Sequence, residues 1–132
     1  MWLDDNTRAA LRGALVERLW PSFADATIEI MPGEMPAGES VGGSPLLRFV
    51  IPYSAVTIDG PHVLIPAGID SEFLQAGDAG WARWKASGTH HRLSLQCSTG
   101  HGAGLFRMND LRVMQGAAVR TQASMLRIGG GA

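Results

Sequence analysis

The chain has 132 residues, of which 45% are hydrophobic and 17% charged; it is too apolar to be disordered and long enough to bury one core without a metal or a disulfide. Its apolar runs are far too short to span a membrane, and no secretory signal is visible. Cys97, the single cysteine, cannot form an internal disulfide, which favours folding in a reducing compartment. We therefore expect one domain over residues 1–132.

The N-terminal segment predicts a single helix, from about residue 6 to residue 20. Polar and acidic residues at positions 4–7 supply N-cap oxygens and negative charge where a helix begins. Pro21 ends the helix. Its apolar stripe is built on Leu11, Leu15 and Leu19. The stripe needs a surface to lie on, and Trp2, before the cap, either packs on the helix or reaches a partner.

After Pro21 the apolar period changes from helical spacing to alternation, which predicts β-strands. In the first half these are residues 27–31, 46–51 and a hairpin, 54–58 with 61–65, whose turn carries a type I′ signal at Asp59-Gly60. Residues 31–45 are rich in Gly and Pro and offer few backbone hydrogen bonds. We expect this loop to be the most mobile internal segment, or to be ordered only by contacts from elsewhere.

The second half continues the same pattern up to a glycine-rich tail at residues 129–132. The expected strands are 80–86, 91–97, 105–108, 111–114 and 117–128, with a weak strand or helical turn at 71–75. Short strands at this spacing indicate a mainly β fold: an antiparallel β-sandwich or jelly-roll-like domain over about residues 26–128, behind a short N-terminal α-helix.

The net charge of −1 conceals an uneven distribution. Residues 1–78 carry eleven of the twelve acidic residues and four of the eleven basic ones, a net charge of −7, and residues 79–132 carry +6. The basic residues are spread singly along strands, so a direct nucleic-acid partner is not expected. Two interpretations remain: the halves neutralise each other within one fold, or acidic and basic faces meet between neighbouring copies.

The segments that could carry catalysis or ligand binding give only weak sequence signals. Gly100–Gly104 lacks the third glycine and the following helix of a dinucleotide site, and it has no Lys-Ser/Thr pair of a P-loop. Neighbouring His90 and His91 point to opposite faces of a strand and cannot share a metal. Cys97 lies on the apolar face of its strand and is expected to be buried and inert. We expect no enzyme activity, no cofactor and no metal.

Two tryptophans in the strand 80–86 point to opposite faces, because Trp81 and Trp84 are three residues apart. An outward-facing Trp81 beside Arg83 is compatible with a sugar-binding platform and equally with a subunit contact.

The order of these motifs resembles a family of small virion proteins of tailed bacteriophages, often encoded near the major capsid protein. The resemblance is carried by a strand and Gly-x-x-Pro-Ala turn at residues 28–37, a Gly/Ser loop and Leu-Leu strand at 42–47, and a Gly-x-Ala-x-aromatic-x-Arg strand at 77–88. A turn at 109–110 and the stretch Met-Gln-Gly-Ala-Ala-Val at 114–119 complete it. An added Asp-Gly hairpin near residues 56–67 departs from the family pattern.

This resemblance implies a non-enzymatic virion structural protein, first of all a capsid decoration or cement protein at the capsid surface. Its partners would be the major capsid protein or another virion protein and further copies of itself, as a trimer, with no membrane; it would be made and folded in the bacterial cytoplasm. The alternatives are a neck, tail or baseplate component and a carbohydrate-binding β-sandwich. The candidate interface residues are Trp2, Trp20, Trp81, Arg83, Arg92 and Arg120.

Overall fold

The computed structural model describes residue 2 and residues 4–37, 42–60, 62–86, 90–99 and 106–127, with the backbone alone for residues 86 and 90–92. The chain begins with helix α1 (Asp5–Leu19), within one residue of the predicted bounds. Asp4 is the N-cap residue, and its carboxylate accepts a hydrogen bond from the Thr7 amide at 2.7 Å. Pro21 opens a short 3-10 turn, η1 (Pro21–Phe23), so the helix ends where the sequence predicts.

Ten strands in the described part of the chain form two sheets. The larger sheet has the order β5-β2-β1-β6-β7-β8, with β9 paired to β6, and every pair in it is antiparallel except β7 with β8. Its strands are β1 (Ala26–Pro32), β2 (Leu47–Ile51), β5 (Glu72–Phe73), β6 (Gly77–Ala86), β7 (His90–Ser98), β8 (Phe106–Arg107) and β9 (Arg112–Val113). The smaller sheet has the order β10-β4-β3 and contains β3 (Thr57–Asp59), β4 (His62–Ile65) and β10 (Ser124–Arg127).

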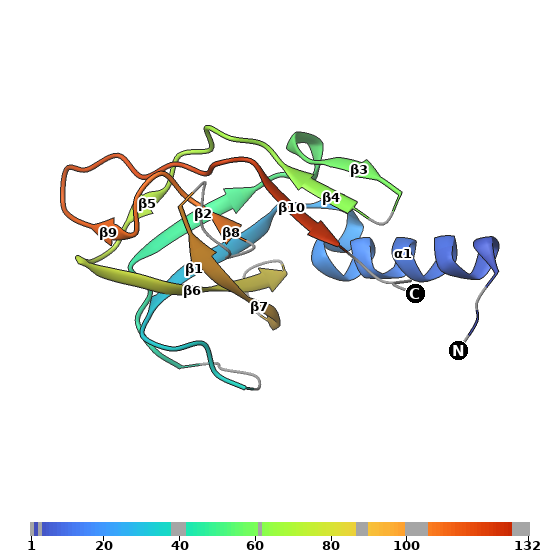
Figure 1. The fold of residues 1–132 in the computed structure, drawn as a ribbon, viewed down its shortest axis with the longest axis horizontal. Helices are drawn as coiled ribbons and strands as arrows, with labels where there is room; N and C mark the ends of the chain where they lie inside the picture. The colour runs from blue at the N-terminus through green and yellow to red at the C-terminus, as the bar shows by residue number, and fades with distance from the viewer. Residues whose placement is uncertain are drawn as a thin grey trace.

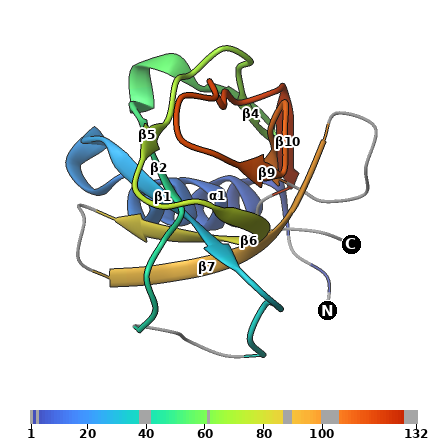
Figure 2. The ribbon, with the colours of Figure 1, turned by 90° about the vertical axis from the view of Figure 1, so that its left-hand side faces the viewer.

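The two sheets face each other across one apolar core. Figure 2 shows β6 and β7 on one side of the molecule and β4 and β10 on the other. Buried residues from both sheets and from the end of α1 form a single cluster, with Phe49 and Phe106 in ring contact at 5.4 Å between their centroids. The prediction of a mainly β, sandwich-like fold with a short N-terminal helix is confirmed.

Local predictions failed in three places. Asp59 pairs with His62 and keeps a negative φ, so Asp59 belongs to β3 and the expected type I′ turn at Asp59-Gly60 is wrong. Residues 53–55 form a 3-10 turn, η2 (Tyr53–Ala55), instead of opening a strand. The long last strand is reduced to β10, because residues 120 and 121 form only isolated bridges to other segments.

Several predictions fall outside the described residues. These are the glycine tail at 129–132, the Gly100–Gly104 loop with His101, and the central part of the loop at 38–41. The same holds for the side chains of His90, His91 and Arg92.

Candidate functional site

Helix α1 projects from the body of the molecule as an arm. In Figure 1 its N-terminal end lies at the far right, away from both sheets. Its buried residues are Val16 and Leu19, both near the C-terminal end of the helix. The predicted apolar stripe is therefore only partly covered: Leu11 is 44% exposed and Leu15 is 39% exposed. Trp2, ahead of the helix, is 80% exposed and remains available for an interface.

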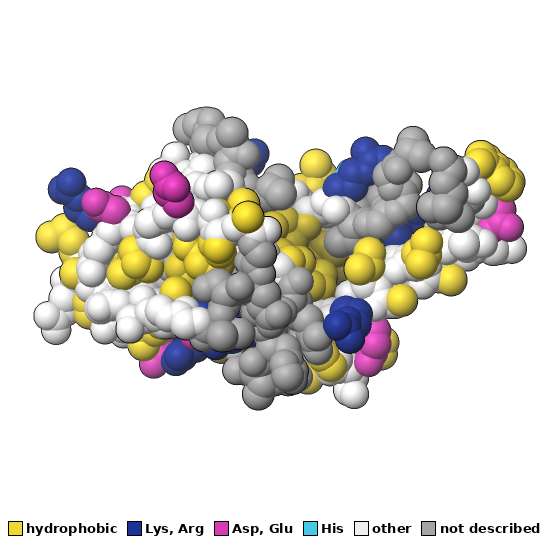
Figure 3. All heavy atoms as spheres, turned by 90° about the horizontal axis from the view of Figure 1, so that it is seen from below, with side chains coloured by type: hydrophobic (Ala, Val, Ile, Leu, Met, Phe, Trp, Pro, Cys, Tyr) yellow, Lys and Arg dark blue, Asp and Glu magenta, His cyan; other side chains and the backbone are white. Residues whose placement is uncertain are grey.

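The surface of this arm carries exposed apolar side chains among charged ones. Seen from below in Figure 3, hydrophobic side chains recur along the arm at the right, and basic side chains gather beside them. Exposed apolar groups that are grouped on one projecting element are typical of proteins that complete their burial in an assembly.

The base of the arm is held to the body by two indole groups. Trp20 donates a hydrogen bond from its ring nitrogen to the Ile51 carbonyl at 3.0 Å, and Trp84 donates one to the Leu19 carbonyl at 3.2 Å. The two rings meet edge to face, with 4.9 Å between their centroids. Trp20 has no exposed surface, so its predicted interface role is wrong; it anchors the helix to the sheet.

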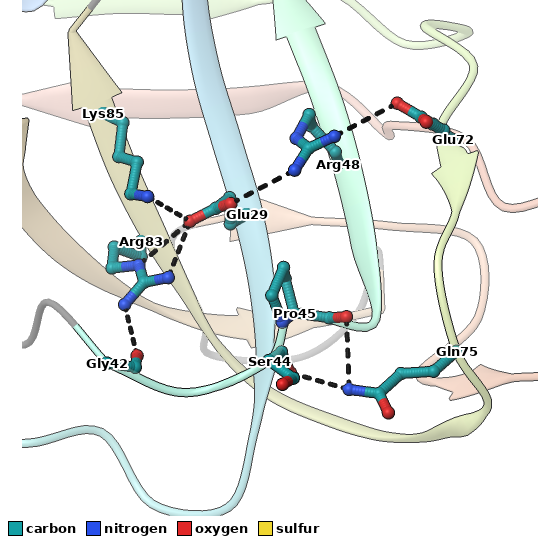
Figure 4. A network of polar contacts seen from close by, with 9 residues as sticks. All are labelled: Glu29, Gly42, Ser44, Pro45, Arg48, Glu72, Gln75, Arg83 and Lys85. Atoms are coloured by element: carbon teal, nitrogen blue, oxygen red, sulfur yellow. Dashed lines mark hydrogen bonds and ion pairs between the residues drawn. The ribbon is translucent and has the colours of Figure 1, made fainter. Parts of the chain in front are cut away.

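A network of ion pairs lies on the face of the larger sheet opposite the core, centred on the buried carboxylate of Glu29 (Figure 4). Arg83 donates to Glu29 Oε1 from Nε at 3.1 Å and from Nη2 at 2.7 Å. The Lys85 ammonium is 3.0 Å from the same oxygen, and Arg48 Nη2 is 3.6 Å from Oε2. Arg48 also pairs with Glu72, which is exposed, at 3.4 Å.

The sheet register explains why these groups meet. Glu29 of β1 is directly opposite Arg48 of β2 and opposite Arg83 of β6, so one acidic position is flanked by two basic ones. Burial by itself would raise the pKa of Glu29, but the hydrogen bonds and the positive charges of Arg83 and Lys85 together outweigh it and hold that pKa below its usual value. β1 and β2 each supply one charged residue and β6 supplies Arg83 and Lys85 at alternating positions, and only the pairing of the strands brings these charges together.

The prediction that Arg83 forms charged contacts with another copy is wrong, because its side chain is buried within this chain. Alternation places it opposite the core, as expected, but its side chain is only 2% exposed. Besides holding Glu29, it donates from Nη1 to the Gly42 carbonyl at 2.6 Å. Gln75 donates to the Ser44 carbonyl at 2.8 Å, so contacts from elsewhere in the chain tie this end of the glycine-rich loop to the sheet. Arg83 therefore serves the fold and the loop.

Trp81 also lies on this face, and it is 4% exposed. Its ring lines a small hollow of about 280 Å³ together with Met31 of β1 and Pro36 of the loop that follows β1. Trp84, on the opposite face, belongs to the core and has no exposed surface. Neither ring offers a face to a sugar, so the carbohydrate platform at these two residues, and the interface role of Trp81, are wrong.

Arg120 is exposed, but it already has a partner within the chain. Its Nε is 2.7 Å from Asp70 Oδ1, and the two residues form an isolated β-bridge. Arg112 lies 3.9 Å from Asp78, and Lys85 and Arg83 bind Glu29, so basic residues of the second half repeatedly meet acidic residues of the first. These contacts favour the interpretation in which the two halves neutralise each other within one fold. The Arg92 side chain lies outside the described part of the structure.

The remaining candidates for chemistry are the single cysteine and the groups that could bind a metal. Cys97 is half-buried against the core, and burial raises the pKa of its thiol to about 12. Within the described ranges, no three His, Cys, Asp or Glu side chains are grouped closely enough to hold a metal ion, and neither α1 nor the 3-10 turns could cross a membrane. Comparison with protein-family models, with curated proteins and with solved structures finds no match.

Proposed function

We propose that this protein is a non-enzymatic structural component of a tailed-phage virion, and specifically a capsid decoration or cement protein. The observation that carries the proposal is the projecting arm, which presents Trp2, Leu11 and Leu15 to solvent while its base is fixed to the body. A protein that works alone gains nothing from such a surface, whereas a protein that binds a lattice uses it to gain buried apolar area.

Two further observations support this role. The resemblance to small virion proteins runs through most of the sequence and consists of strands and turns, the elements of a scaffold. The larger sheet carries ion pairs between its own strands, so these charges are committed to the fold. The arm offers exposed apolar side chains for docking.

The proposal is tested by mixing the purified protein with phage capsids that lack it and measuring co-sedimentation. Wild type is expected to saturate the capsid, and Leu11→Asp with Leu15→Asp is expected to abolish binding because both side chains lie on the exposed part of the arm. Met114→Asp is the matched control, since Met114 is 54% exposed on a different part of the surface. Binding by the arm variant equal to that of wild type would overturn the proposed docking role.

The copy number in the virion separates the two virion locations. Quantitative mass spectrometry of purified particles should give a number matched to the capsid lattice if the protein decorates the head. A small number matched to a single vertex would instead assign the protein to the neck, tail or baseplate, and would overturn the decoration role.

A further inference from the structure

The outer face of the smaller sheet carries an apolar hollow of about 430 Å³. Its floor is a cross-strand row, because Thr57 of β3 is paired with Leu64 of β4, and Leu64 with Met125 of β10. Pro66 and Ala123 complete the apolar wall. Met125 is 56% exposed, so this part of the hollow is open to solvent.

One charged residue, Arg107, is among the described residues that line this hollow. The backbone amide of Arg107 donates a hydrogen bond to the Ser124 hydroxyl oxygen at 2.9 Å, and this bond fixes the position of the residue. Its guanidinium forms no ion pair with any described residue, in contrast to Arg48, Arg83, Arg112 and Arg120. Among the described residues, the hollow therefore combines apolar walls with one cation that has no ion-pair partner, and it suits an apolar group followed by a carboxylate.

The N-terminal arm of this same chain has that chemistry. Trp2 is a large apolar side chain that is 80% exposed, and Asp4 and Asp5 follow it closely. Neither carboxylate forms an ion pair within the described ranges, although Asp4 caps the helix through Thr7. An indole followed by two negative charges is complementary to an apolar hollow beside Arg107.

Insertion must occur between two copies. Only the C-terminal part of α1 is buried, and the fifteen residues of the helix extend for about 22 Å, so the arm carries Trp2 away from its own body. Figure 1 shows the N-terminal end of α1 beyond the end of β3 and β4. A contact between one surface and a different surface is heterologous, and it generates a ring where the rotation closes.

We propose that Trp2 of one copy inserts into the hollow over Leu64 and Met125 of a second copy, with Asp5 of the arm paired to Arg107. This inference deepens the proposed virion role by naming a second copy as a partner beside the capsid, and it rests on that role. A single inserted ring and one ion pair form a small interface, so association is weak in dilute solution and grows with concentration.

Two measurements on the full-length protein report this contact. Sedimentation equilibrium between about 10 μM and 1 mM is expected to show reversible self-association. Acrylamide quenching of tryptophan fluorescence is expected to fall over the same range. Trp20, Trp81 and Trp84 are at most 4% exposed, so the quenchable signal comes from Trp2.

The variants separate this contact from other modes of association. Trp2→Ala and Met125→Asp are each expected to weaken association by more than about tenfold, because they remove the inserted ring and place a charge in the hollow. Met114→Asp, a methionine of equal exposure outside the hollow, is expected to leave it unchanged. Arg107→Glu is expected to weaken association, and Asp5→Arg in the same chain is expected to restore it by reversing the pair.

Each outcome decides between the two proposals. No self-association at about 1 mM, or association that Met125→Asp leaves intact, overturns the insertion. Failure of Asp5→Arg to restore Arg107→Glu overturns the proposed charge pair. If the protein self-associates in this way but does not bind capsids, the decoration role is contradicted and the insertion of Trp2 is supported. If the protein binds capsids but stays monomeric, the insertion is contradicted and the decoration role is supported.

Discussion

Replacing Glu29 by Gln tests whether the buried ion network stabilises the fold. The substitution keeps the shape of the side chain and removes its charge, while Arg83 remains 2% exposed and Lys85 remains at the edge of the network. Breaking a buried ion pair by removing one partner costs about 3–5 kcal/mol. Arg48 and Lys85 are partly exposed and can regain water, so we expect the lower end, a loss of about 3 kcal/mol in the free energy of unfolding.

The assay is urea unfolding followed by far-ultraviolet circular dichroism, with Glu72→Gln as the matched control. The Glu72 side chain is 62% exposed, and its ion pair with Arg48 lies at the solvent-exposed surface. Removing this pair is therefore expected to lower the free energy of unfolding by less than about 1 kcal/mol. An unchanged denaturant slope would show that the loss is one of stability, with no change in the surface exposed on unfolding.

The pH dependence of the free energy of unfolding gives a second test of the Glu29 network. The pKa of Glu29 is lowered in the folded state, since the hydrogen bonds and the positive charges of Arg83 and Lys85 together outweigh the effect of burial. A carboxylate of this kind contributes stability that is fully present above its unfolded pKa, about 4.3, and that is lost as the pH falls through the folded value. The stability difference between wild type and Glu29→Gln should therefore be largest at neutral pH and shrink in acid.

Two results would refute this reasoning. One is a loss for Glu29→Gln no larger than that for Glu72→Gln. The other is a difference that stays constant from neutral pH into acid. The double variant Glu29→Gln with Arg83→Met should lose less than the sum of the two single variants, because both remove the same pair.

Three further predictions follow from single positions. Cys97 should react slowly with a thiol reagent in the folded protein and rapidly in denaturant, because burial raises its pKa to about 12; equal rates would contradict this. Gly80→Ala should lower the free energy of unfolding by about 1–3 kcal/mol, since a methyl group there would overlap the Gly33 carbonyl, whereas Gly13→Ala, in open space on α1, should raise it by about 0.5–1 kcal/mol. In hydrogen exchange the amides of residues 33–35, 37 and 42–44 should be among the least protected, and Arg83→Met should lower protection at 42–44 further because the bond to the Gly42 carbonyl is lost. Strong protection in wild type would refute the expectation of a mobile loop.

The local features of this protein could be read from its sequence because their causes are local. Asp4 and Pro21 mark the ends of α1, since a cap and a missing amide act on the nearest turn. Alternation separated Trp84 from Arg83 correctly, because neighbouring side chains in a strand point to opposite faces. The class of fold followed from many such short alternating runs.

Tertiary structure alone decided which side chains are covered. Trp81 and Arg83 point away from the core, as alternation requires, yet the loop on that face and the carboxylate of Glu29 bury them. Leu11 and Leu15 have the spacing of a buried stripe, but α1 contacts the body only near its end. A period in sequence fixes the direction of a side chain, whereas exposure depends on what another segment, distant along the chain, places over it.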